Sequence, residues 1–197
     1  QWTARLSRMA GNARPLLAAD GGADHLARIG LRAEAVIGDL DSISDRTRAW
    51  LGEDVMVHRP DQDRTDLEKS LDYAFTELGL SELSVLAAVG GRSDHEVGNL
   101  GLLARYAMGE DLLYEGHDWR ALAVSGEATL AAAEGETWSF WTYDPAVRVT
   151  IEGVRWPVSG AALDAGNRPS ISNEAVGDRI TVNATGGSVV VFRRLSS

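Results

Sequence analysis

The sequence predicts an α/β domain with a parallel sheet, followed by an antiparallel β-sandwich. Up to about Gly109, short apolar runs alternate with amphipathic stretches at helical spacing, which is the pattern of repeated βα units. After Gly109, short β-branched and aromatic runs are separated by turn residues, and no long amphipathic pattern follows. We therefore predict a first domain at residues 1–110 and a second domain at residues 111–197.

Four βα units can be recognised in the first half. The predicted strands are 16–19, 34–37, 54–58 and 83–89, and the helices that follow them are 23–29, 45–51, 67–78 and 96–108. The third helix has the clearest pattern, because its apolar residues recur at helical spacing, namely Leu67, Leu71, Ala74, Phe75 and Leu78. We expect a Rossmann-like domain in which all four strands join one sheet.

The second half contains short runs that are typical of strands. They lie at 138–143, 147–151, 180–183 and 189–192. No Pro/Ser-rich linker separates them from the first half, so we expect two closely packed domains.

The composition excludes several classes of function. The formal net charge is −10, and no run of Lys and Arg could bind a phosphate backbone, so we expect no nucleic-acid partner. The absence of cysteine excludes disulfides, thiolate nucleophiles and cysteine-based zinc sites. No apolar stretch approaches the ~20 residues that span a bilayer, so we expect no membrane partner and a cytoplasmic protein.

Charged residues follow each predicted strand of the first half. Ligands of parallel α/β sheets bind at the carboxyl ends of the strands, where the loops into the helices lie. The residues at these positions are Asp20 after the first strand, Asp39 and Asp41 after the second, Asp61, Asp63 and Asp66 after the third, and Arg92 and Asp94 after the fourth. Isolated surface acids would not all be expected at one edge of a sheet.

The segment from Gly38 to Ser42 is expected to continue an extended strand. Residues two apart would then project to the same side, so that Asp39 and Asp41 could face one cation. The alternative is that one of these acids caps the next helix and the other is solvated.

The segment 61–69 lies at a helix start. Thr65 and Glu68 fit a capping box. Lys69 is not explained by capping, because a cation in the first turn opposes the helix dipole. A phosphate bound at this N-terminus would remove the conflict, since it would also use the free backbone N–H groups.

The segment Gly90-Gly91-Arg92-Ser93-Asp94-His95 combines a backbone that a ligand can approach closely with a guanidinium suited to phosphate. Alternatively, Arg92 only pairs with Asp94. The acids as a set require a cation, and Mg²⁺ fits best because it prefers carboxylate oxygens and is commonly shared with substrate phosphates. Such a metal would also allow an acidic protein to bind ATP.

Five blocks, in this order and spacing, resemble the thiamin pyrophosphokinase family. They are Asp20-Gly21-Gly22-Ala23-Asp24, Gly38-Asp39-Leu40-Asp41-Ser42, Asp61 to Lys69, Gly90 to His95 and Ser170-Ile171-Ser172-Asn173-Glu174. The resemblance implies an N-terminal nucleotide-binding α/β domain, a C-terminal β-sandwich and a homodimer whose thiamin sites lie between subunits. Family members usually open with a further strand, which we expect to be missing or truncated in a chain that begins at Gln1.

The same resemblance implies roles for individual residues. Asp39, Asp41 and Asp66 correspond to Mg²⁺ ligands, and Asp20 and Asp94 to acids at or next to the metal. Contacts to the ATP phosphates fall to Gln62, Thr65, Lys69 and Arg92. Ser170, Ser172 and Asn173 would hold the aminopyrimidine of thiamin, and Trp156 is a candidate face for the thiazolium cation or, equally, an aromatic of the sandwich core.

The implied reaction is in-line attack of the thiamin hydroxyl on the β-phosphorus of ATP, with release of AMP. One alternative is a diphosphokinase for another heteroaromatic alcohol, such as a hydroxymethylpterin, although the block at 170–174 favours thiamin. A second is a phosphatase with Asp39 as nucleophile. A third is a nucleotide- or thiamin-binding module without catalysis.

Overall fold

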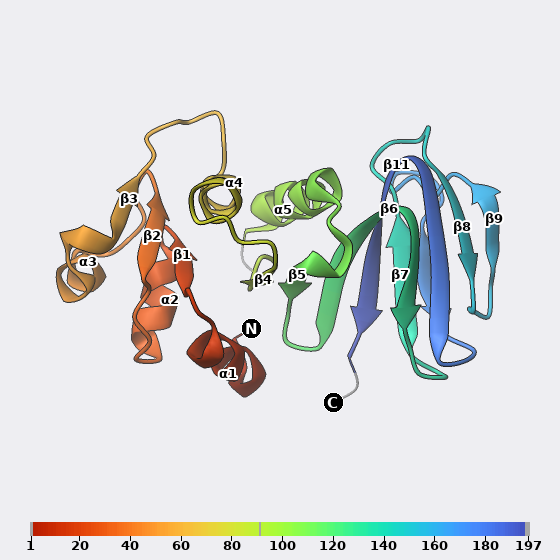
Figure 1. Cartoon of the computed structure of the whole chain (residues 1–197), viewed down its shortest axis with the longest axis horizontal. Coiled ribbons are helices and arrows are strands. Elements are labelled where there is room, and N and C mark those ends of the chain that lie inside the picture. The colour runs from red at the N-terminus through yellow and green to blue at the C-terminus, as the bar shows by residue number, and fades with distance from the viewer. Residues whose placement is uncertain (1, 91, 196–197) are drawn as a thin grey trace. The chain divides into compact units, whose positions relative to one another are not determined.

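The computed structural model describes residues 2–90 and 92–195 (Figure 1). The chain forms two compact units, Thr3–Ser81 and a unit that begins at Glu82. This division lies before the predicted boundary near residue 110, because β4 (Leu83–Leu86) pairs with β5 (Leu112–Glu115). Strand β5 pairs in turn with β6 (Trp119–Ala131), so the fourth βα unit is continuous with the β-rich part of the chain.

The N-terminal unit contains a parallel sheet of order β1-β2-β3. Its elements are α1 (Ala4–Asn12), β1 (Leu17–Ala19), α2 (Gly22–Arg28), β2 (Ala35–Gly38), α3 (Asp45–Leu51), a 3-10 turn (Glu53–Val55), β3 (Met56–His58), α4 (Asp66–Asp72) and a π-helical turn (Tyr73–Glu77). The first three predicted βα units are therefore confirmed, although β1 and β3 are shorter than predicted and β2 is shifted by one residue. Helix α1 precedes the first of these units.

Strand β2 is the centre of this unit. All four of its residues are buried, which is expected for a parallel strand covered on both faces. Helices α2 and α4 both pack against β1, and α4 also packs against β2. Apolar helix residues complete the core, among them Leu6, Leu26, Leu51, Leu71 and Ala74.

The C-terminal unit is built on an eight-stranded mixed sheet. Its other elements are α5 (Ser93–Tyr106), a 3-10 turn (Gly109–Asp111), β7 (Thr137–Trp141), β8 (Arg148–Glu152), β9 (Val158–Ala161), β10 (Ser170–Glu174) and β11 (Arg179–Arg194). The order is β10-β7-β11-β6-β5-β4, with β8 on β11 and β9 on β8. Only the β4–β5 pair is parallel among the described pairs of this sheet.

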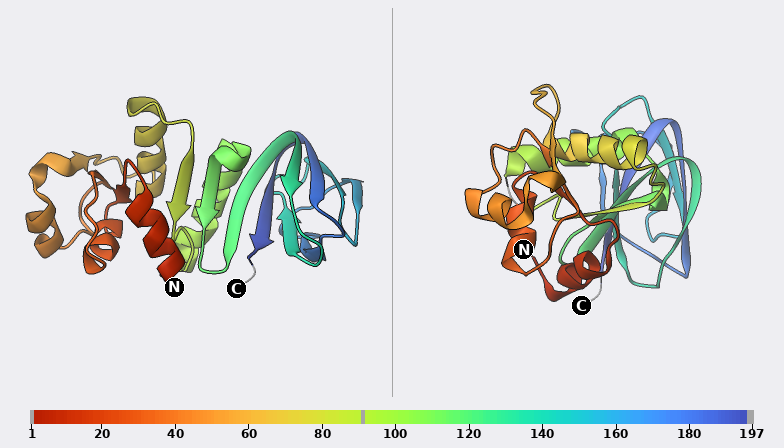
Figure 2. Two further views of the ribbon diagram at one scale, coloured as in Figure 1. Left: turned by 60° about the horizontal axis from the view of Figure 1, so that its bottom comes forward. Right: turned by 60° about the vertical axis from the view of Figure 1, so that its left-hand side comes forward.

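Strand β11 organises the sandwich. It runs antiparallel to β6 along its length, and Figure 2 shows the two as long neighbouring strands. Its first part also pairs with β8 and its second part with β7, and the pairing with β6 is irregular between Ala184 and Ser188. The runs predicted at 180–183 and 189–192 are thus two parts of one strand. Trp138, Phe140 and Ile151 lie in the sandwich core.

Among the described residues, no helix has the length and apolar character needed to span a membrane.

Candidate active site

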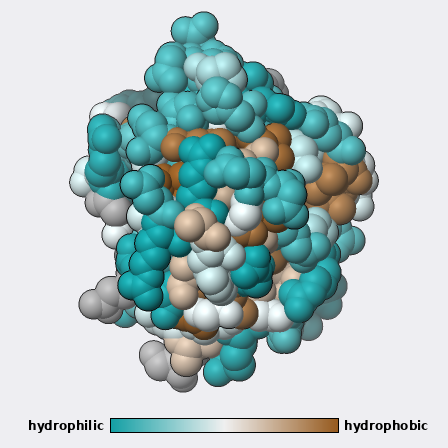
Figure 3. All heavy atoms as spheres, turned by 90° about the vertical axis from the view of Figure 1, so that its left-hand side faces the viewer, coloured by the Kyte–Doolittle hydropathy of each residue, from teal (hydrophilic) through white to brown (hydrophobic). Residues whose placement is uncertain are grey.

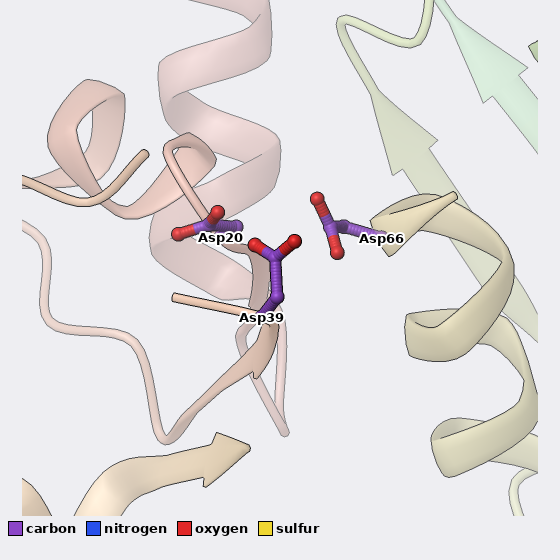
Figure 4. A group of neighbouring side chains, drawn as sticks. All are labelled: Asp20, Asp39 and Asp66. Atoms are coloured by element: carbon purple, nitrogen blue, oxygen red, sulfur yellow. The ribbon is translucent and has the colours of Figure 1, made fainter. Parts of the chain in front are cut away.

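Three carboxylates of the N-terminal unit meet at the carboxyl ends of β1 and β2 (Figure 4). Asp20 follows β1, Asp39 follows β2, and Asp66 is the first residue of α4. One carboxylate oxygen of each residue lies within 4.8 Å of the others. Like charges at such distances repel one another. A set of three carboxylates fits a hard divalent cation such as Mg²⁺, so these residues have the chemistry of a metal site.

Asp20 is the buried member of the group, with 2% of its surface exposed. Its two carboxylate oxygens accept hydrogen bonds from the backbone N–H groups of Ser42 and Ile43, each at 3.0 Å. Burial raises the pKa of Asp20 and is the largest influence on it, while these two hydrogen bonds act in the opposite direction. Asp20 therefore also anchors the loop that follows β2.

Asp39 is held by a side chain from the loop between β3 and α4. Its Oδ2 accepts a hydrogen bond of 2.8 Å from Nε2 of Gln62. This hydrogen bond is the main reason why the pKa of Asp39 lies below its ordinary value. Gln62 was predicted to contact phosphate, and the structure gives it a carboxylate partner that the sequence analysis did not identify.

Asp66 is paired with Lys69 one helical turn later. The Lys69 ammonium lies 3.0 Å from Oδ1 of Asp66, and only 3% of the residue is exposed. The helix begins as predicted, because the Thr65 hydroxyl caps it by accepting the N–H of Glu68. Asp66 already offsets the charge of Lys69, so this position of the lysine does not require a bound phosphate.

Gly38 lets two of the acids approach. A Cβ at this position would lie 2.8 Å from Cβ of Asp20 and 2.9 Å from Oδ1 of Asp66. This role of Gly38 was not predicted. The signal for it in the sequence is a glycine that ends a buried strand and directly precedes an acid.

Asp41 is not a member of the three-carboxylate group. The prediction that residues 38–42 continue an extended strand is wrong, because β2 ends at Gly38 and Leu40 has a left-handed φ of 65°. The alternative that an acid caps the next helix also fails, since Ser44 caps α3. Asp41 is exposed and accepts a hydrogen bond from the Ser42 hydroxyl, and its role as a metal ligand stays a prediction.

Arg92 and Asp94 lie in the other unit, after β4. The prediction that they share a sheet edge with the other acids is wrong, because β4 belongs to the eight-stranded sheet. Arg92 donates two hydrogen bonds to Asp94, at 2.6 and 3.2 Å, as the alternative interpretation expected. The hydrogen bond from Arg92 is the main cause that lowers the pKa of Asp94 to about 2. Gly91 of this block lies outside the described residues.

The block at 170–174 forms strand β10, and Asn173 is its buried residue, 1% exposed. Its Oδ1 accepts the backbone N–H of Trp156 at 3.1 Å, and its Nδ2 donates to the Trp156 carbonyl at 2.8 Å and to Oγ of Ser170 at 3.3 Å. The predicted contact of Asn173 with a ligand would have to compete with these bonds. In the structure, Asn173 holds the segment that carries Trp156.

Trp156 is exposed over 58% of its surface, so it is not a core aromatic. The guanidinium of Arg155 lies 5.8 Å from the centre of its ring. Ser172 is also exposed, with a left-handed φ of 57°, and its N–H donates to the Ser139 hydroxyl at 3.0 Å. An aromatic face and a serine are therefore available at the surface of the β-rich unit.

A polar pocket of about 650 Å³ lies between α2 and α3 in the N-terminal unit. Figure 3 shows that the face of this unit turned to the viewer is mostly hydrophilic, with small hydrophobic areas. None of the predicted site residues lines the pocket. Its lining residues are Asp24, Ala27, Arg28, Ser44, Arg46, Thr47 and Trp50.

Comparison with known proteins agrees with the resemblance in the motifs. Residues 6–112 match the model of the thiamin pyrophosphokinase catalytic domain, and residues 127–189 match the model of the vitamin B1 binding domain of the same enzymes. The chain belongs to the thiamin pyrophosphokinase family. All three acids of the cluster lie within the segment that matches the catalytic domain of thiamin pyrophosphokinase, and Ser170 to Glu174 lie within the segment that matches its B1-binding domain.

Individual thiamin pyrophosphokinases are similar over most of the chain. The thiamine pyrophosphokinase of Bacillus subtilis is 25% identical over 181 residues, which cover 88% of this chain and 84% of the relative. Thiamine pyrophosphokinase 1 of Oryza sativa is 27% identical over 186 residues, which cover 84% of this chain and 67% of the relative. The solved structure of thiamin pyrophosphokinase from Candida albicans matches with a TM-score of 0.80 at 17% identity, over 100% of this chain and 86% of that one. The predicted fold class is thereby confirmed.

Proposed function

We propose that this chain transfers a diphosphate group from ATP to the primary alcohol of thiamin, giving thiamin diphosphate and AMP. The observation that carries the proposal is the group of three carboxylates at the strand ends, in a segment that matches the catalytic domain of thiamin pyrophosphokinases. The second match, to a vitamin B1 binding domain, favours thiamin over a hydroxymethylpterin as acceptor.

We propose Mg²⁺ as the metal, held by Asp39 and Asp66 with Asp20 beside them. When bound, the ion would neutralise negative charge on the phosphates during transfer. Asp41, predicted as a third ligand, is close enough for its charge to act on Asp20. Gln62 would orient Asp39 through its hydrogen bond, so the metal-binding oxygens would be positioned before the substrate arrives.

The transfer would be a single in-line displacement. The thiamin hydroxyl oxygen would bond to the β-phosphorus of ATP. The bond from the β-phosphorus to the oxygen that bridges it to the α-phosphorus would break, and AMP would leave with this oxygen and the electron pair of the bond. The hydroxyl proton would pass to a carboxylate of the acid cluster. Of the predicted phosphate contacts, Lys69 is buried, whereas Gln62, Thr65 and Arg92 are exposed and could reach ATP. Arg92 is hydrogen-bonded to Asp94, which would therefore also lie near the phosphates.

For thiamin, we propose Trp156, Ser170 and Ser172 as the contacts, with Asn173 holding Trp156 in place. A cationic ring against an exposed indole would contribute about 0.5–2 kcal/mol. The working unit is proposed to be a cytoplasmic homodimer that binds no nucleic acid, with residues 1–110 as its catalytic domain and 111–197 as its thiamin-binding domain.

The test is to incubate the purified protein with MgATP and a panel of acceptors, including thiamin and 6-hydroxymethylpterin, and to identify both products. We expect thiamin diphosphate and AMP in equal amounts, and no turnover after chelation of divalent metal. Asp39→Asn serves as the control against a contaminating kinase, because it keeps the shape of the side chain and should lower kcat by ~10²–10³.

ADP as the stoichiometric nucleotide product would mean that the γ-phosphate moves, which would refute the diphosphate transfer. Turnover with the pterin but not with thiamin would refute the acceptor. A phosphorylated protein that forms without any acceptor would instead support the phosphatase alternative.

A further inference from the structure

The acid cluster contains a buried cation of its own. Lys69 is 3% exposed, and its ammonium contacts Oδ1 of Asp66 at 3.0 Å. Its charge also reaches Asp39, whose pKa is lowered first by the Gln62 hydrogen bond and further by Lys69. The ammonium therefore pairs directly with one of the three acids, and the carboxylate oxygens of the other two lie within 4.8 Å of an oxygen of that acid.

Burial makes a direct contact with a substrate phosphate difficult for this residue. A phosphate could reach the ammonium only if the ion pair with Asp66 opened or the first turn of α4 moved. A buried charge is costly to separate from its partner, so the pair is expected to persist. The role of Lys69 should therefore be sought inside the cluster.

We propose that Lys69 is the internal counter-charge of the metal site and that it limits the affinity of this site for free metal. The inference rests on the proposed function, in which Asp20, Asp39 and Asp66 hold a divalent ion. Three carboxylates and one ammonium leave two negative charges, which a single divalent cation neutralises. Without the ammonium, the same oxygens would attract a cation more strongly.

This arrangement has a use in catalysis. A site with moderate affinity for the free ion can accept it together with the phosphates of ATP and release it with the products. A site with a further uncompensated charge would retain the ion, as sites formed only from clustered carboxylates and other oxygens do. Lys69 would thus favour exchange of the metal at each turnover.

The experiment measures binding of Mn²⁺ alone, by electron paramagnetic resonance, to the wild type, Lys69→Met and Lys69→Arg. Methionine keeps most of the length of the side chain and removes its charge, whereas arginine keeps the charge. We expect the Mn²⁺ dissociation constant of Lys69→Met to fall at least about tenfold. That of Lys69→Arg should stay within about threefold of the wild type, because the charge remains.

A second pair of variants separates charge from positioning. If Lys69 acted only by holding Asp66 in place, Lys69→Met would have no effect in an Asp66→Asn background. Under the proposal it still tightens Mn²⁺ binding there, since Asp20 and Asp39 keep their charges. The double variant removes both members of a buried pair together, which proteins tolerate better than loss of one member, so it remains measurable if Lys69→Met alone does not fold.

The outcomes are distinct. Weaker or unchanged Mn²⁺ binding in Lys69→Met, or in the double variant relative to Asp66→Asn, overturns the counter-charge role while leaving the proposed reaction intact. At least tenfold weaker binding of ATP to Lys69→Met in the presence of EDTA would assign the ammonium to a phosphate instead. If the wild type binds no Mn²⁺, the metal site itself is refuted, and the role of Lys69 with it.

Discussion

At the scale of single residues, the spacing of the acids depends on a residue without a side chain. Gly38 ends β2 between the side chains of Asp20 and Asp66. Any Cβ there would lie closer to both acids than real Cβ atoms come to their neighbours. The close grouping of the carboxylates therefore requires glycine at this position.

We predict that Gly38→Ala weakens Mn²⁺ binding at least about tenfold, because the added methyl group pushes Asp20 and Asp66 apart and disturbs the preorganised site. Electron paramagnetic resonance of Mn²⁺ gives the affinity, and circular dichroism checks the fold. Gly11→Ala is the matched control, since a Cβ at Gly11, inside α1, meets nothing within 4 Å. Wild-type Mn²⁺ affinity in Gly38→Ala would show that the acids do not need their observed spacing.

The residue-scale predictions from sequence succeeded where local rules apply. Thr65 was predicted to be a cap from its spacing to Glu68, and Asp39 and Asp66 were predicted to lie at one sheet edge from their positions after strands. Asp41 was grouped with Asp39 on the assumption of an extended backbone. That assumption failed at Leu40, because a left-handed conformation at a residue other than glycine leaves no clear signal in the sequence.

At the scale of elements, β10 and the segment before β9 are joined as one structure. The N–H of Arg155 donates to the carbonyl of Glu174 at 2.8 Å, and the N–H of Val176 donates to the carbonyl of Gly153 at 3.0 Å. Asn173 adds its side-chain bonds to Trp156 from within the same stretch. The exposed indole of Trp156 therefore lies on a segment that is fixed to β10 by hydrogen bonds.

We predict that Asn173→Ala lowers the free energy of unfolding by about 1–3 kcal/mol, because it leaves the N–H and carbonyl of Trp156 without their partner. The KM for thiamin should rise while the KM for ATP stays near its wild-type value. Urea denaturation and steady-state kinetics provide the measurements, with the exposed Asn167→Ala as control. A raised KM for thiamin with no loss of stability would favour direct contact of Asn173 with thiamin.

Most elements could be predicted from sequence because periodicity and caps are local properties. Helix α3, for example, begins directly after Ser44 and matches its predicted bounds. The sheet to which β4 belongs could not be predicted in this way. Strand pairing depends on residues distant in sequence, and the βα pattern of residues 83–108 looks the same whether β4 joins β1 or β5.

At the scale of the whole molecule, the proposed chemistry is divided between the two units. The carboxylate group lies in Thr3–Ser81, whereas Trp156 and Ser172 lie in the unit that begins at Glu82. In the homodimer that we propose, one subunit would supply the acids and the other would hold thiamin. A two-fold axis would produce two such composite sites.

We predict that two inactive variants restore activity when they are refolded together. Asp39→Asn removes the metal function and Trp156→Ala with Ser172→Ala removes the acceptor function. Random pairing makes about half of the dimers mixed, each with one intact site, so activity should recover to about a quarter of the wild type. Mass spectrometry confirms the mixed dimers. If they form and remain inactive, each site is built within one subunit.

Strand β11 also determines how the C-terminal unit can exchange its amide protons with solvent. It pairs with β6, β7 and β8, and Val189, Val190 and Val191 are all 0% exposed. Strands β9 and β10 can fray, because each has a single described partner strand. The amides of Val190 and Val191 lie between β6 and β7, so they can open only when β11 separates from these central strands. In heavy water, their exchange rates would therefore report the global unfolding free energy of this unit.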